Sequence, residues 1–189
     1  MSAITNRLDG AATVLLEESS MGGDQGVCTT LLADPAAPSV LFVTFTRQPA
    51  ACLSQLEDAE AGVRNVGVTT VGDAGAAGDR DDAVIENVST PSDLTGLGIE
   101  IGQFLSEWDP PVTVCFDSLT SMLQYVDFET AYEFLHAITG QVHAAGARAH
   151  FHIDPDAHDE QHVAGITSLF DASVSVDEET RVRTRDVIE

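Results

Sequence analysis

A loop near the N-terminus has the layout of a phosphate-binding loop but lacks its lysine. The segment Glu18–Leu32 is a run of small residues that opens into a helix. In the pattern G-x-x-x-x-G-K-[ST], glycines let backbone amides surround a phosphate, the lysine neutralises it and the hydroxyl holds magnesium. Aligned on Thr29, the chain has Gly22 at the first glycine, Val27 at the second and Cys28 at the lysine.

No lysine elsewhere can replace the missing charge, because all eight basic residues of the chain are arginines. Arg47, just after the second predicted strand, is the candidate substitute, with pairing to a surface acid as its alternative role. Asp117 ends an apolar strand, as does the carboxylate that orients magnesium in phosphoryl-transfer enzymes. The candidate nucleotide pocket comprises Gly22, Gly23, Cys28, Thr29, Thr30, Arg47 and Asp117.

Histidines and aspartates form a second candidate site in the C-terminal third of the chain. His150, His152 and Asp154 share one face of a predicted strand because strand side chains alternate. His158 and His162 lie four residues apart on a predicted helix, which is a spacing that two zinc ligands use. The candidate metal ligands are His152, Asp154, His158 and His162.

Ordinary structural roles compete with metal binding. Asp154 or Asp156 is placed to cap the following helix, and the strand histidines can form hydrogen bonds at a polar sheet end. The cysteines Cys28, Cys52 and Cys115 are widely spaced, with no C-x-x-C pattern. Cys115 lies in an apolar run, so we expect it to be a small buried hydrophobic residue.

Alternating strands and helices must position these candidates. Apolar runs predict strands at 11–17, 39–45, 66–71, 112–116 and 147–153, a short edge strand at 83–88, and a terminal hairpin of 172–176 and 181–188. Amphipathic segments predict helices after the loop and at 49–61, 128–145 and 158–170. Another helix runs to Trp108 after a cap by Ser92 or Asp93, and a mobile loop is expected at 72–82. This alternation predicts one α/β domain over residues 1–189. Its doubly wound, mainly parallel sheet has helices on both faces, giving three layers.

The chain resembles the KaiC/RecA-like branch of the P-loop NTPase superfamily, and within it short haloarchaeal KaiC-like proteins. The resemblance covers nearly the whole chain and rests on four segments: Leu15–Glu17, Leu41–Thr46, Asp117–Thr120 and Leu169–Val174. It implies a RecA fold that stacks into rings or filaments and binds ATP between subunits.

The chain departs from this family where the family does its chemistry. Val27 and Cys28 replace the second glycine and the lysine, and Thr46 and Arg47 stand where paired glutamates would activate water. The loss of phosphate neutralisation and of the general base disfavours ATP hydrolysis. The sequence therefore predicts a catalytically inactive interaction module in signalling or regulation, with a vestigial nucleotide pocket and no firm cofactor. The alternatives are an ATP/Mg-binding protein or weak ATPase that uses Arg47, and a metal-binding protein.

The amino-acid composition indicates the cellular environment of the protein and limits the classes of partner it is expected to bind. A net charge of −23, the absence of lysine and only 6% aromatic residues are typical of a salt-adapted cytoplasmic protein. Without a basic patch the chain is not expected to bind nucleic acid. It also has no apolar run long enough to cross a membrane. A protein partner or self-association is the expected mode of action.

Overall fold

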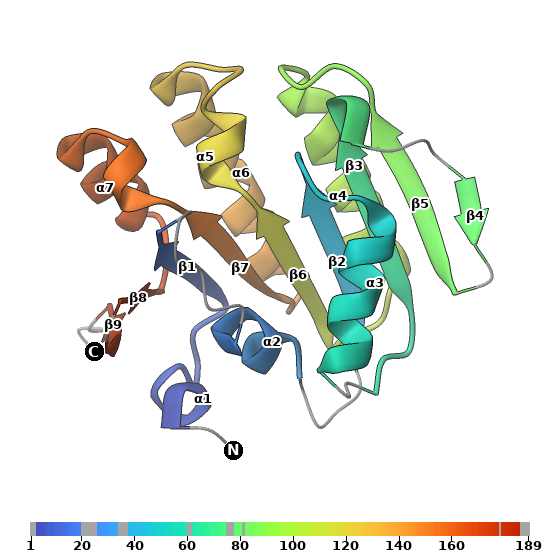
Figure 1. The fold of residues 1–189 in the computed structure, drawn as a ribbon, viewed down its shortest axis with the longest axis horizontal. Coiled ribbons are helices and arrows are strands. Elements are labelled where there is room, and N and C mark those ends of the chain that lie inside the picture. Colours follow the sequence, from blue (N-terminus) through green and yellow to red (C-terminus); the bar gives the residue numbers. More distant parts are fainter. Residues whose placement is uncertain are drawn as a thin grey trace.

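Nine strands form one mixed sheet in the computed structural model, which describes residues 3–19, 26–33, 38–59, 62–74, 78–80, 82–177 and 179–185. Their order is β4-β5-β3-β2-β6-β7-β1-β8-β9 (Figure 1). The two edge pairs are antiparallel, and the pairs between them are parallel. The strands are β1 (Thr13–Glu18), β2 (Ser39–Thr44), β3 (Val66–Val71), β4 (Gly78–Arg80), β5 (Ala83–Val88), β6 (Val112–Asp117), β7 (Arg148–Ile153), β8 (Ala172–Val176) and β9 (Thr180–Thr184).

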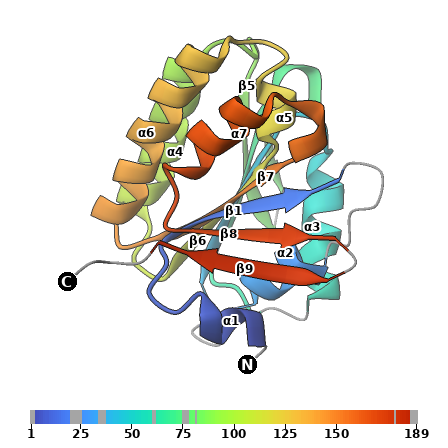
Figure 2. The ribbon, with the colours of Figure 1, turned by 90° about the vertical axis from the view of Figure 1, so that its left-hand side faces the viewer.

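Helices cover both faces of the sheet (Figure 2). One face carries α1 (Ala3–Arg7), α2 (Gly26–Leu32) and α3 (Pro49–Asp58). The other carries α4 (Leu94–Glu107), α5 (Leu119–Met122), α6 (Phe128–Ala144) and α7 (Glu160–Thr167). Two short 3-10 helices complete the described elements, η1 (Gly72–Ala74) and η2 (Pro155–Ala157). The predicted three-layer α/β fold is confirmed. No helix among the described residues is long and apolar enough to cross a bilayer.

Alternation along two central strands decides which side chains meet which helices. On β6, Phe116 points into the core under α4 and α6, whereas Cys115 points into the core under α2 and α3. On β7, Phe151 likewise belongs to the core under α4 and α6. His150 and His152 therefore project from the opposite face of β7, toward α2.

Some predicted elements differ from the structure at their ends. The strand at 83–88 is not an edge strand, because β4 pairs outside it within the segment predicted as a loop. The last helix begins at Glu160 rather than at His158. Its N-cap is Asp159, whose carboxylate accepts a hydrogen bond from the Gln161 backbone amide at 2.8 Å.

Candidate functional site

Two cysteines and two histidines meet beneath α2. Cys28 comes from α2, Cys115 from β6, and His150 and His152 from β7. The two sulfurs lie 3.8 Å apart, the Cys28 sulfur is 3.2 Å from His150 Nε2, and the Cys115 sulfur is 3.5 Å from His152 Nε2. All four potential ligand atoms lie within 4.8 Å of one another. The residues are buried, with exposed fractions of 1%, 0%, 2% and 8% in the order named. We call them the Cys/His cluster.

Sheet register and helix periodicity bring the Cys/His cluster together. Cys115 and His150 are direct partners in the parallel pairing of β6 with β7. His152 lies two residues further along β7 and so points to the same face. Across from them, α2 turns Cys28 and Leu32 toward the sheet, and both are buried because they lie four residues apart on one helix face.

Polar side chains surround the cluster and orient its members. The Nδ1 atom of His152 lies 2.5 Å from Glu18 Oε1, and the other oxygen of that carboxylate is buried with no partner among the described residues. The Gln55 side-chain amide donates to the Cys28 sulfur at 3.1 Å. Each end of the cluster is therefore held by a second layer of hydrogen bonds.

The electrostatics of the cluster favour negative charge on one sulfur. Hydrogen bonding from Cys115 lowers the pKa of Cys28 well below its usual value, against the effect of burial and helped by the charge of His150. The same hydrogen bond, together with burial, raises the pKa of Cys115 well above its usual value. Burial disfavours charge on His152, but hydrogen bonds with Cys28 and Glu18 outweigh it and raise the pKa of His152 to about 10. The Cys28 thiolate and the Glu18 carboxylate thus favour a positive charge on His152.

A polar cavity of about 330 Å³ lies beside the cluster, at the carboxyl ends of β1, β6 and β7. The carboxyl ends of these strands lie along the same side of the sheet in Figure 1. Carboxylates and hydroxyls dominate its walls, and its lining residues are Glu18, Ser19, Thr46, Arg47, Asp117, Ser118, Thr120, Ser121, His152, Ile153 and Asp154. Open α/β sheets bind ligands at this edge.

Among the described residues, Arg47 is the one arginine that lines this polar cavity, and its guanidinium already has partners. Its Nη1 atom donates to Gln55 Oε1 at 2.8 Å, and its Nη2 atom donates to the Ala51 carbonyl at 3.1 Å. Nη1 also lies 3.7 Å from Asp117 Oδ2. The guanidinium is therefore fixed between α3 and the end of β6.

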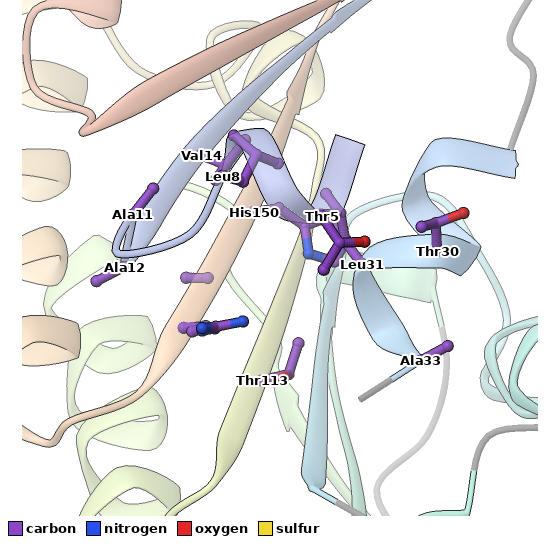
Figure 3. A pocket seen from close by; sticks show the side chains of 12 residues that line it. Thr5, Leu8, Ala11, Ala12, Val14, Thr30, Leu31, Ala33, Thr113 and His150 are labelled. Carbon is purple, nitrogen blue, oxygen red and sulfur yellow. The ribbon is translucent and has the colours of Figure 1, made fainter. Parts of the chain in front are cut away.

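The described residues of the candidate nucleotide pocket lie in three different surroundings. Gly22 and Gly23 lie outside the described residues. Cys28 points into the Cys/His cluster and does not line the polar cavity, whereas Arg47 and Asp117 do. Thr29 is half-buried on α2. The hydroxyl of Thr30 donates to the Gly26 carbonyl at 2.7 Å, and Thr30 lines a different pocket of about 220 Å³ between α1 and α2, where His150 forms part of the wall (Figure 3).

The four residues of the candidate metal set are not gathered by the structure. Only His152 joins the Cys/His cluster. Asp154 caps η2 by accepting from the Asp156 amide at 3.0 Å. His158 bonds through Nε2 to the Thr120 hydroxyl at 3.0 Å, and burial lowers its pKa. His162 stacks on Phe128 with ring centroids 4.2 Å apart. The residues that lie within ligand distance of His152 are Cys28, Cys115 and His150.

The sheet order and the two helical layers are those of an α/β protein with a RecA/KaiC-like fold, which solved structures share. PH0250 from Pyrococcus horikoshii OT3 is similar, with 15% identity, a TM-score of 0.64, and coverage of 94% of this chain and 88% of that one. The flagellar accessory protein FlaH from Methanocaldococcus jannaschii is also similar, with 12% identity, a TM-score of 0.58, and coverage of 96% of this chain and 81% of that one. The uncharacterized protein PH0321 from Pyrococcus horikoshii, in complex with an unknown peptide, has 10% identity and a TM-score of 0.64. The match covers 95% of this chain and 88% of that one.

The chain belongs to the Family of unknown function (DUF7504), whose model matches residues 11–176. A search of curated proteins gave no match. At identities of 10–15% the solved structures show a shared fold alone, because one fold can host many unrelated functions.

Proposed function

We propose that this protein is a RecA/KaiC-like domain that does not hydrolyse ATP and acts by binding a protein partner or further copies of itself, in regulation or signalling. The observation that carries the proposal is the side chain at the lysine position. Cys28 is 1% exposed and its sulfur contacts Cys115 and His150, so this position supplies no cation to a phosphate. The strongly acidic composition supports a cytoplasmic setting at high salt.

The neighbouring cavity is poorly suited to a triphosphate. Glu18, Asp117 and Asp154 line it, and Arg47 and His152 are the basic side chains in its wall among the described residues. These carboxylates would repel a phosphate, and more strongly where water is partly excluded. Arg47 would have to leave Gln55 and Asp117 to reach a phosphate, and Thr46 offers no carboxylate to activate water.

Apolar surface elsewhere supports an interaction role. Ile99 and Tyr125 are large hydrophobic side chains with exposed fractions of 57% and 51%. Ile99 lies on α4 beside a groove of about 600 Å³ between α4 and α6, whose wall also includes Gly98 and Phe134. Exposed apolar surface of this kind is frequent at protein–protein contacts. The similar structure of PH0321 was solved with an unknown peptide, which makes a peptide segment a reasonable class of partner.

The alternative function is ATP binding with Arg47 in place of the lysine. One observation favours it: Arg47 and Asp117 line the same cavity, at the edge where open α/β sheets bind ligands. In this alternative Asp117 would orient magnesium and Arg47 would contact phosphate.

Titration calorimetry with Mg-ATP in molar salt separates the two functions. We expect no binding heat, no thermal shift, and hydrolysis at background level, since the loss of even one charge-stabilising group costs on the order of 10²–10³ in rate. The matched variant is Arg47→Ala. Saturable binding by the native protein that disappears in this variant would show that the alternative is right and that the site still takes nucleotide.

A further inference from the structure

We propose that the Cys/His cluster holds a single zinc ion in a closed site that stabilises the fold. The ligands are the Sγ atoms of Cys28 and Cys115 and the Nε2 atoms of His150 and His152. The proposal goes beyond the question of nucleotide binding and rests on the geometry of these residues alone. It also gives the cysteine at the lysine position a chemical role.

Three distances within the cluster are close to the edges of a zinc tetrahedron, and the remaining ones are within 4.8 Å. With Zn–S bonds of about 2.3 Å and Zn–N bonds of about 2.0–2.1 Å, a tetrahedral ion holds two sulfurs about 3.8 Å apart and a sulfur and a nitrogen about 3.6 Å apart. The observed sulfur–sulfur separation of Cys28 and Cys115 is 3.8 Å. The sulfur–nitrogen separations are 3.2 Å to His150 and 3.5 Å to His152. Small adjustments would therefore place all four atoms around one ion.

The donor set selects the kind of metal and the kind of site. Two sulfurs and two imidazole nitrogens in a tetrahedral arrangement suit zinc rather than calcium or magnesium, which take oxygen ligands. Four protein ligands leave no position for water or substrate, so the site is structural rather than catalytic. Two thiolates also cancel the ion's charge, which matters because Cys28 and Cys115 are almost fully buried.

The second layer of contacts is the one that zinc ligands require. Imidazoles that bind metal commonly donate their other N–H to a carboxylate, and His152 does so through Nδ1 to Glu18. Arg47 donates to the Gln55 oxygen, which turns the Gln55 amide N–H toward the Cys28 sulfur. The cluster is thus oriented from both sides before any ion binds.

The alternative is a metal-free core of thiols and imidazoles. It would bury two histidines whose cluster-facing Nε2 atoms contact only sulfur among the described residues, and a neutral thiol is a weak hydrogen-bond partner. The two sulfurs at 3.8 Å are also far from the roughly 2.05 Å of a disulfide bond. A zinc ion satisfies both sulfurs and both nitrogens at once.

Metal analysis of the native chain tests the proposal directly. The untagged 189-residue protein, purified without chelator under reducing conditions, should contain one zinc per chain when it is measured by inductively coupled plasma mass spectrometry. After exchange with cobalt(II) it should show the visible bands of a tetrahedral site and a thiolate-to-cobalt charge-transfer band. Cys115→Ser and His150→Gln should lose the metal and these bands, and the matched control Cys52→Ala should keep both, because Cys52 is buried on the same side of the sheet but lies outside the cluster.

Two results would overturn the zinc site. One is a reduced native protein that takes up neither zinc nor cobalt. The other is zinc that survives Cys115→Ser but is lost from the double variant H158Q/H162Q, which would assign the metal to the histidines outside the cluster. Both results are independent of whether Mg-ATP binds, so the failure of this proposal and the failure of the proposed function can be told apart.

Glu18 acts in this proposal as a positioning residue rather than a ligand. Glu18→Gln should weaken zinc binding by about 10–100-fold while leaving one zinc per chain at saturation, because an outer carboxylate fixes the orientation of the histidine. Competition against a chromophoric chelator measures the affinity. Glu17→Gln is the matched control, since Glu17 accepts a hydrogen bond from the Ser175 hydroxyl and does not touch the cluster. Equal affinities for the two variants would contradict the role given to Glu18.

Discussion

Replacing Cys28 with serine should lower the midpoint of thermal unfolding by about 8–16 °C in buffer that contains free zinc. A ligand present at about one thousand times its dissociation constant stabilises the folded state by about 4 kcal/mol. For a domain of this size each kcal/mol corresponds to about 2–4 °C. Serine preserves the size of the side chain but supplies no thiolate, so most of this stabilisation should disappear. Circular dichroism during heating in molar salt measures the shift.

Chelation provides the control for this loss. A strong chelator should lower the midpoint of the native protein to that of Cys28→Ser and leave the variant itself unchanged, because the variant has no ion to give up. Cys52→Ala, which trims a side chain of similar burial, should still respond to the chelator. A native midpoint that does not move under chelation would contradict a stabilising metal.

Replacing Phe116 with alanine should lower the free energy of unfolding by about 3–5 kcal/mol and yet leave the zinc in place. Phe116 is 0% exposed, and its ring packs at centroid distances of 5.1 Å from Phe151 and 5.8 Å from Phe45. It follows Cys115 directly on β6 but belongs to the core on the opposite face of the sheet. Urea unfolding gives the stability, and elemental analysis of the folded variant gives the metal content.

This variant separates loss of metal from loss of stability. Phe116→Leu refills part of the space and should recover much of the loss while behaving identically in metal content. Folded Phe116→Ala that has lost its zinc would mean that the site depends on packing across the whole sheet, and not on the α2 face alone.

The sheet was predictable because its central strands are continuous apolar runs, which parallel strands covered on both faces require. Val66–Val71 and Ala83–Val88 have the predicted bounds. The errors fall where local signals are weak. The short β4 lies in a stretch rich in glycine, alanine and aspartate that has no apolar period, and its pairing with β5 depends on a partner strand rather than on its own sequence.

The Cys/His cluster was not predicted because its members lie far apart in the chain. Cys28 is 87 residues from Cys115 and 122 residues from His150, so no short spacing reveals them. Two signals were present: Cys28 stands at the lysine position, and His150 and His152 share one strand face. The sequence does not show that β6 pairs with β7, and this pairing places Cys115 beside His150. Strand pairing depends on the order of strands in the sheet, which the local sequence does not determine.

The long separation of the cluster residues also sets an order of events during protein synthesis. A growing chain that has not yet reached His150 can offer only the two cysteines, and β7, which carries both histidines, must pair between β1 and β6 before the cluster exists. Metal capture therefore becomes possible only late in translation, after the strands at both sides of β7 have been made. The ion would bind once β7 has paired, while β8 and β9 still follow in the chain, and a chain truncated before β7 could not retain it.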